Sequence, residues 1–193
     1  MALNAHARAV TDRLVLPVAR GLVRAGATAN WLTFCGLVFT VVGVVIVLRG
    51  HAFAGAVVMA CATAVDALDG AVARLRGTSS RFGSFYDSVT DRVSDAAIFG
   101  AAAWLVRGDP LLFGVAMVAL AGAQVTSYVR AKAESLGWDA TVGIIERPER
   151  VMIIITAIGL GFLEVALWVL AVGSVVTIGQ RLAAVLRQVG EEP

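Results

Sequence analysis

One apolar run, from residue 30 to residue 50, constrains this chain more than any other feature. It reads NWLTFCGLVFTVVGVVIVLRG and contains no charged residue before Arg49. About 20 apolar residues in an α-helix cross the hydrocarbon core of a bilayer. Further apolar runs follow over 52–75, 82–106, 110–129, 150–163 and 165–187. The sequence therefore predicts an all-α, polytopic membrane protein with six transmembrane helices within residues 30–187.

The overall composition agrees with a membrane protein rather than a soluble one. Hydrophobic residues make up 59% of the chain and charged residues 16%, whereas soluble domains average about half apolar and about a quarter charged. The formal net charge of +2 gives no reason to expect a nucleic-acid partner. No internal repeat or break in composition divides the sequence, so residues 1–193 are expected to form one domain in contact with membrane lipids.

An amphipathic helix is predicted over residues 7–24, before the first apolar run. One face of this helix carries Val10, Leu14, Val18 and Leu22, and arginines cluster on another face. A helix with this pattern lies in the membrane interface, because its apolar face enters the lipid while its cationic face meets anionic headgroups.

The placement of lysine and arginine predicts the orientation of the six spans. With six crossings, both termini lie on the same side as the loops 74–81 and 130–150. That side carries nearly all of the basic residues, whereas the opposite side carries Arg49 and Arg107. Because basic loops stay in the cytoplasm, we expect a multi-pass protein of the cell membrane with both termini cytoplasmic.

Four aspartates interrupt the apolar pattern where the second span ends and the third begins. Asp66 and Asp69 lie near the end of the second span, and Asp87 and Asp91 lie near the start of the third. Residues three or four apart share a face of a helix, and a short loop makes the two helices antiparallel neighbours. The four carboxylates are therefore expected to converge, just inside the cytoplasmic interface.

Converging carboxylates in a medium of low dielectric repel one another unless protons or cations relieve the charge. Hard divalent cations prefer oxygen ligands, and four carboxylates suit a pair of them, as in enzymes of phosphoryl transfer. Two other interpretations stay open from the residues alone. The aspartates either form an interfacial salt network with Arg74, Arg81 and Arg92, or line the cation or proton pathway of a transporter.

The stretch from Asp66 to Asp91, DALDGAVARLRGTSSRFGSFYDSVTD, resembles the signature of the CDP-alcohol phosphatidyltransferases. That signature reads D-x2-D-G-x2-A-R-x8-G-x3-D-x3-D, and all of its fixed positions are filled here. The resemblance implies a membrane enzyme that transfers a phosphatidyl group from CDP-diacylglycerol to an alcohol and releases CMP. It also implies a homodimer, for which small residues of the third span, Gly100 and Ala101–Ala103, offer a close-packing surface.

The resemblance also implies roles for the residues of the motif. Two divalent cations, Mg²⁺ or Mn²⁺, would be held by Asp66, Asp69, Asp87 and Asp91. Asp91 would in addition be the catalytic base for the acceptor hydroxyl. The CDP-lipid would be bound by Gly70, Ala73, Arg74 and Gly83. Asp95 lies outside the motif, one turn deeper than Asp91, and is expected to support the site or the structure.

Basic residues near the predicted cytoplasmic ends of the later spans indicate the chemical class of the acceptor alcohol. They suit a phosphorylated alcohol, although cytoplasmic loops are basic for topological reasons alone. The segments SRFGSFYDSVTDRVSDAAIFG, SYVRAKAE and IERPER resemble the actinobacterial phosphatidylinositol phosphate synthases of this family, which implies an inositol phosphate as acceptor. Its phosphate would be bound by Arg130, Lys132, Arg150 and Arg181.

Two points about the acceptor stay open at this stage. Arg147 is a weaker candidate for phosphate binding, because it has Glu146 and Glu149 beside it as ion-pair partners. Phosphatidylglycerol phosphate synthesis, with glycerol 3-phosphate as acceptor, would use the same metals, the same donor and a similar basic pocket.

Overall fold

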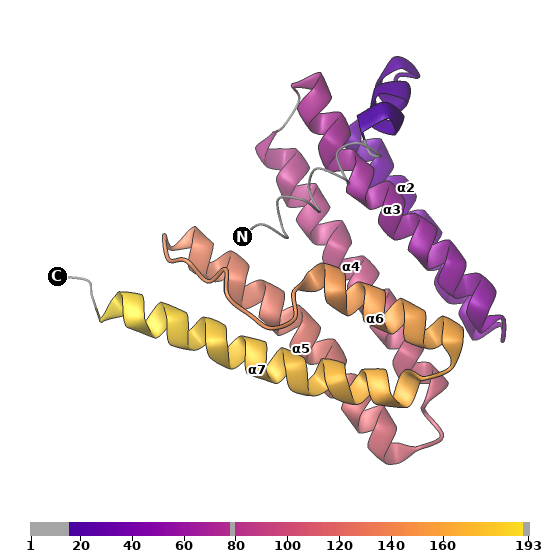
Figure 1. Cartoon of the computed structure of the whole chain (residues 1–193), viewed down its shortest axis with the longest axis vertical. Helices are drawn as coiled ribbons and strands as arrows, with labels where there is room; N and C mark the ends of the chain where they lie inside the picture. The colour runs from indigo at the N-terminus through magenta and orange to yellow at the C-terminus, as the bar shows by residue number, and fades with distance from the viewer. Residues whose placement is uncertain (1–15, 78–79, 191–193) are drawn as a thin grey trace.

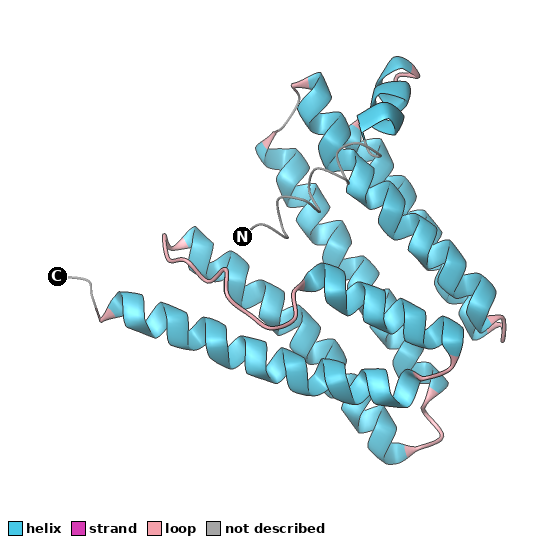
Figure 2. Ribbon diagram, viewed as in Figure 1, coloured by secondary structure: helices cyan, strands magenta, loops and turns pink. Residues whose placement is uncertain are grey.

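The computed structural model describes residues 16–77 and 80–190, and every regular element within them is an α-helix (Figure 2). The long helices are α2 (Ala29–Leu48), α3 (Ala52–Arg76), α4 (Arg81–Leu105), α5 (Pro110–Ser135), α6 (Arg147–Leu160) and α7 (Leu163–Val189). A further helical segment covers residues 16–24, whereas the first part of the predicted interfacial helix 7–24 lies outside the described residues. The all-α prediction is confirmed.

Local sequence signals account for the ends of the helices around the α3–α4 turn. Helix α3 ends at Gly77, whose φ of 64° is left-handed and costs glycine little. Helix α4 begins after Ser80, whose hydroxyl accepts a hydrogen bond from the Gly83 amide at 3.0 Å. Such a cap satisfies an amide that has no partner within the helix. Four residues, 77–80, therefore separate the last residue of α3 from the first residue of α4.

Four of the described helices, α2, α3, α5 and α7, are long and apolar enough to cross a membrane. Helix α4 has 25 residues, but its first half carries the charged residues of the aspartate motif. Helix α6 has 14 residues, which extend about 21 Å at about 1.5 Å per residue, less than the roughly 30 Å of a bilayer core. The assignment of α4 and α6 as spans therefore stays a prediction.

The helices form two pairs, antiparallel α2 and α3 and parallel α5 and α7, with α4 and α6 between the pairs (Figure 1). Helices α2 and α3 pack along each other, as do α5 and α7. Helix α4 contacts both α2 and α5, and α6 contacts α3 and α7. The main buried cluster lies where these elements meet, and its large members include Met59, Phe99, Ile154 and Leu167.

Glycines allow the closest approach between paired helices. A Cβ atom on Gly43 of α2 would lie 2.9 Å from the carbonyl oxygen of Gly55 in α3 and 2.5 Å from Cγ of Met59. A Cβ atom on Gly122 of α5 would lie 2.6 Å from Cβ of Ser174 in α7. Real Cβ atoms do not approach other atoms this closely, so both pairs depend on glycine.

Three of the four small residues that were assigned to a dimer surface are buried within the chain. Ala101, Ala102 and Ala103 of α4 are each at most 3% exposed, because α4 is surrounded by α2, α5 and α6. These alanines therefore pack against the same chain and offer no surface to a partner. Gly100 is partly exposed, and nothing approaches its Cβ position within 4 Å.

Candidate active site

Three of the motif aspartates meet between α3 and α4. Asp66, Asp69 and Asp87 each offer one carboxylate oxygen to a group in which all three oxygens lie within 4.8 Å of one another. Asp66 and Asp69 share a face of α3 because they are three residues apart, and Asp87 of α4 meets them where α3 and α4 both pack against α2. The predicted convergence of Asp66, Asp69 and Asp87 is therefore confirmed.

A hydroxyl from α2 fixes one of these carboxylates. Thr33 is 4% exposed, and its Oγ1 donates a hydrogen bond of 2.6 Å to Oδ2 of Asp69. Sequence analysis missed this residue, because the hydrogen bond joins positions 36 residues apart and depends on how α2 docks on α3. A hydrogen bond of this kind orients a carboxylate before a ligand arrives.

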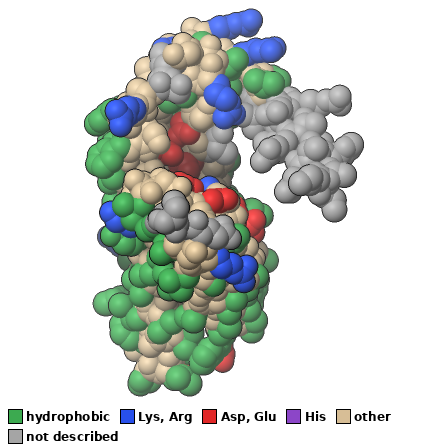
Figure 3. Space-filling view, turned by 90° about the vertical axis from the view of Figure 1, so that its left-hand side faces the viewer, with side chains coloured by type: hydrophobic (Ala, Val, Ile, Leu, Met, Phe, Trp, Pro, Cys, Tyr) green, Lys and Arg blue, Asp and Glu red, His purple; other side chains and the backbone are tan. Residues whose placement is uncertain are grey.

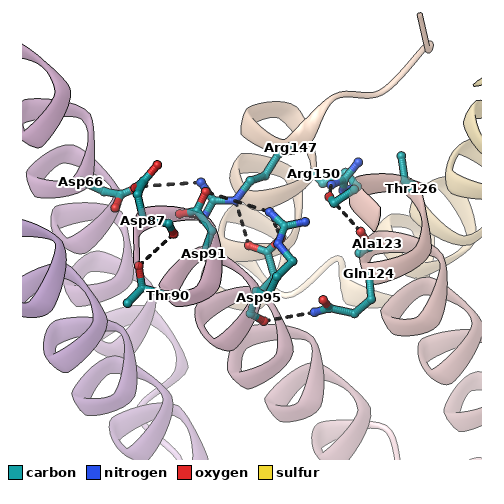
Figure 4. A network of polar contacts seen from close by, with 12 residues as sticks. Asp66, Asp87, Thr90, Asp91, Asp95, Ala123, Gln124, Thr126, Arg147 and Arg150 are labelled. Atoms are coloured by element: carbon teal, nitrogen blue, oxygen red, sulfur yellow. Dashed lines mark hydrogen bonds and ion pairs between the residues drawn. The ribbon is translucent and has the colours of Figure 1, made fainter. Parts of the chain in front are cut away.

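The fourth motif aspartate, Asp91, faces an arginine of α6. Its Oδ1 lies 2.8 Å from Nη2 of Arg147, and Nη1 of the same arginine lies 3.6 Å from Oδ2 of Asp66. Arg147 was a weaker candidate for phosphate binding because Glu146 and Glu149 beside it offered ion-pair partners, but among the described residues its ion pairs are with aspartates (Figure 4). It meets them because α6 docks with its first turn over α4.

Asp95 lies one turn beyond Asp91 and is only 1% exposed. Its Oδ1 accepts a hydrogen bond of 3.3 Å from Nε of Arg147, and its Oδ2 lies 3.7 Å from Nη2 of Arg92. The Arg92 carbonyl in turn accepts a hydrogen bond of 3.1 Å from the side-chain amide of Gln124 in α5. These contacts tie α4, α5 and α6 together beside the three-aspartate group.

A basic cavity of about 870 Å³ opens next to the aspartates. Asp91 and Arg147 lie on its wall, and three of the predicted acceptor-binding residues line it, Arg130, Arg150 and Arg181. Figure 3 shows acidic side chains gathered in a hollow of one face, with basic side chains near them and hydrophobic side chains covering the lower part.

Two of the cavity arginines are buried without a carboxylate partner among the described residues. Arg150 is 1% exposed and donates to the Ser127 hydroxyl at 3.1 Å, while Arg181 is 3% exposed and donates to the Thr126 carbonyl at 2.6 Å. Burying a cation without a counter-charge is costly. Such a site is stabilised when an anion binds in the cavity.

The fourth predicted acceptor-binding residue is not on this cavity. Lys132 is exposed and does not line the cavity that contains Arg130. Both residues are on α5, but residues two apart in a helix point to nearly opposite sides, since each residue turns about 100°. The prediction for Lys132 therefore differs from the structure, and the helical angle explains the difference.

The residues predicted to bind the CDP-lipid lie around the turn between α3 and α4. A Cβ atom on Gly70 would lie 3.6 Å from Nη1 of Arg74, and one on Gly83 would lie 3.2 Å from the Ser80 hydroxyl. Arg74 is exposed and Ala73 is partly exposed. The absence of side chains at the two glycines leaves the backbone open beside the aspartates.

Comparison with known proteins identifies a family whose members cover nearly the whole chain. Residues 27–183 match the family described as CDP-alcohol phosphatidyltransferase. The chain is 41% identical over 191 residues to a phosphatidylinositol phosphate synthase of Mycobacterium marinum, a match that covers 92% of this chain and 82% of that protein. It is 38% identical over 206 residues to a protein of the same name from Streptomyces avermitilis, with 98% and 84% covered.

Solved structures show the same fold. The crystal structure of the phosphatidylinositol phosphate synthase of Mycobacterium tuberculosis with CDP-DAG bound matches with a TM-score of 0.83 at 39% identity, over 90% of this chain and 94% of that chain. A second crystal structure of that protein, in complex with manganese and citrate, also has a TM-score of 0.83 at 39% identity and covers 89% of this chain and 88% of that chain.

Proposed function

Because the chain belongs to the CDP-alcohol phosphatidyltransferase family, we propose that it transfers a phosphatidyl group from CDP-diacylglycerol to an inositol phosphate and releases CMP. One observation carries the acceptor assignment: a cavity beside the aspartates contains two buried arginines without carboxylate partners among the described residues. The relatives that share about 40% of the sequence over most of their length are named phosphatidylinositol phosphate synthases. The protein is a multi-pass membrane enzyme.

The aspartates fit divalent cations. Asp66, Asp69 and Asp87 place three oxygens within 4.8 Å of one another, and Mg²⁺ and Mn²⁺ prefer such hard oxygen ligands. We assign two cations to these residues together with Asp91. The crystal structure of the Mycobacterium tuberculosis relative in complex with manganese supports this assignment. Cations bound there would neutralise negative charge on the phosphates of the donor.

The donor lies along the α3–α4 turn in this proposal. Gly70 and Gly83 let the CDP group approach the backbone, Ala73 adds little bulk, and the exposed guanidinium of Arg74 pairs with pyrophosphate oxygens. A relative's crystal structure has CDP-DAG bound. The diacylglycerol chains remain in the lipid, which suits a site that faces the membrane interface.

The acceptor lies in the basic cavity, where Arg130, Arg150 and Arg181 bind its phosphate. Asp91 lies on the same wall and takes the proton from the acceptor hydroxyl. The hydroxyl oxygen then forms a bond to the β-phosphorus of the donor, and the bond from that phosphorus to CMP breaks. Glycerol 3-phosphate would also carry a phosphate to these arginines, so phosphatidylglycerol phosphate synthesis is the alternative reaction.

The membrane placement of the enzyme is part of the proposal. We place six spans across the cell membrane in one domain, with both termini and the active site on the cytoplasmic side, because that side carries nearly all of the basic residues. We also expect a homodimer, as the family resemblance implies. Its interface must lie elsewhere than Ala101–Ala103, since these residues are buried within the protomer.

A direct test is CMP release by the purified protein in detergent with CDP-diacylglycerol and Mg²⁺ or Mn²⁺. Inositol 3-phosphate, glycerol 3-phosphate, free inositol and serine are compared in parallel. We expect release that depends on the metal and is fastest with inositol 3-phosphate. A preference for glycerol 3-phosphate would show that the acceptor assignment is wrong, while the assignment of the donor site would stand. Metal-dependent ion flux in proteoliposomes without CMP release would instead support the transporter.

A further inference from the structure

Asp95 is a buried charge that the family motif does not include. It is 1% exposed, and a buried carboxylate is costly unless cations and hydrogen-bond donors surround it. Nε of Arg147 donates a hydrogen bond of 3.3 Å to Oδ1, and Nη2 of Arg92 lies 3.7 Å from Oδ2, which accepts no hydrogen bond from the described residues. The charge of Asp95 is therefore compensated mainly by Arg147.

Arg147, which binds Asp95, also contacts two of the reactive carboxylates, while Nη2 of Arg92 lies 4.0 Å from Oδ2 of Asp91. Arg147 is the first residue of α6. Its Nη2 lies 2.8 Å from Asp91, and its Nη1 lies 3.6 Å from Asp66 (Figure 4). Because a guanidinium group is planar, fixing Nε also fixes the directions of both Nη atoms.

Burial distinguishes the three carboxylates around Arg147. The side chain of Asp95 is 1% exposed, whereas those of Asp91 and Asp66 are 16% and 26% exposed. The contact with Asp95 therefore lies at the closed, inner end of the network. The contacts with Asp91 and Asp66 lie at its open end, where Asp91 lines the cavity assigned to the acceptor.

We propose that Asp95 is a positioning residue, whose carboxylate fixes the guanidinium of Arg147 so that Arg147 holds Asp91 in the direction needed to take the acceptor's proton. The proposal rests on the function proposed above and adds a residue to it. A misplacement of about 1 Å in a reacting group costs about 100-fold in rate. Loss of the Asp95 contact is thus expected to lower turnover more than substrate binding.

The test is a double-mutant cycle of Asp95→Asn and Arg147→Ala in the full-length enzyme. Asp95→Asn keeps the size of the side chain and removes its charge. We expect its kcat to fall about 10- to 100-fold, with KM for CDP-diacylglycerol within about threefold of wild type. If Asp95 acts through Arg147, the double variant is no slower than Arg147→Ala alone. Independent losses that multiply would overturn the proposal.

Asp109→Ala is the matched control for loss of stability alone. Asp109 caps α5 at the far end of α4 through hydrogen bonds from the amides of Leu111 and Leu112 at 2.9 and 3.0 Å. Its removal should lower the midpoint of thermal unfolding and leave kcat unchanged. If Asp95→Asn behaves in the same way, with a lower midpoint and normal kcat, Asp95 is structural and the proposal is wrong.

The thermal measurements also separate this proposal from the proposed function. Unfolding midpoints of the same four proteins in the cycle are measured without substrate. Additive midpoint shifts for Asp95→Asn and Arg147→Ala would show that the two side chains are not coupled, which overturns the proposal whatever the activity. A different outcome is that the midpoint shifts of the variants are coupled, but the wild-type protein releases no CMP with any acceptor. That result would contradict the proposed function and, with it, the catalytic part of this proposal.

Discussion

Replacing Thr33 by valine should weaken the binding of divalent cations without disturbing the fold. Thr33 is 4% exposed in α2 and donates a 2.6 Å hydrogen bond to Asp69, a proposed metal ligand. Valine has nearly the same shape, so the packing between α2 and α3 is retained. The change removes the hydroxyl that holds the Asp69 carboxylate in place.

The size of the effect follows from the type of hydrogen bond. A hydrogen bond to an ionised group contributes about 1.5–3 kcal/mol, and about 1.4 kcal/mol corresponds to a factor of ten in an equilibrium constant. Loss of the bond from Thr33 should therefore weaken metal affinity about 10- to 100-fold. Loss of a hydrogen-bond partner of a metal ligand has effects of about this size in other metal sites.

The assay is a titration of Mn²⁺, followed both by calorimetry and by CMP release. Thr40→Val is the matched control, because Thr40 is also a buried threonine of α2, at 5% exposure, and lies two turns away from Thr33. We expect Thr40→Val to bind Mn²⁺ like the wild type. Equal Mn²⁺ affinity in Thr33→Val and wild type would refute the assignment of Asp69 as a ligand oriented by this hydroxyl.

Four further predictions concern the base, the acceptor, the packing and the metal. Asp91→Asn should lower kcat at least about 100-fold, while its circular dichroism spectrum stays like that of the wild type. Near-normal turnover would show that Asp91 is not the base. Arg150→Ala should raise KM for inositol phosphate about 10- to 100-fold, while Lys132→Ala, which is off the cavity, should change it less than about threefold. Gly43→Ala should destabilise the protein by about 1–3 kcal/mol, because the added Cβ would collide with α3. Gly100→Ala, which has open space at its Cβ position, should not destabilise it, and thermal unfolding compares the two variants. Excess EDTA should abolish CMP release and added Mn²⁺ should restore it, and activity that survives chelation would contradict the metal assignment.

The sequence predicted those features that depend on local periodicity. Apolar runs of the right length predicted six helices close to the observed bounds, although α5 continues to Ser135 and α6 covers Arg147–Leu160 rather than 150–163. The three-residue spacing of Asp66 and Asp69 placed them on one face, and the predicted meeting with Asp87 is observed, although α3 and α4 pack on α2 rather than along each other. The angle between Arg130 and Lys132 is also local, but the prediction placed both in the acceptor site, and only Arg130 lines the cavity.

Other features depend on docking between distant helices and were not predictable in this way. Arg147 meets Asp95 across 52 residues of sequence, and only the packing of α6 on α4 decides that it binds aspartates rather than the neighbouring glutamates. The same holds for the hydroxyl of Thr33 on Asp69. Ala101–Ala103 resemble a surface for close helix contact, but the central position of α4 means that its own chain covers them.

The shortness of α6 has a consequence for the lipid around the enzyme. With an extent of about 21 Å, α6 cannot match a bilayer core of about 30 Å, and it carries Arg147 and Arg150 in its first turn. A helix shorter than the membrane is accommodated by local thinning or by groups that reach toward the interface. The depth of these arginines, and with it the rate of transfer, should therefore vary with the acyl-chain length of the host bilayer.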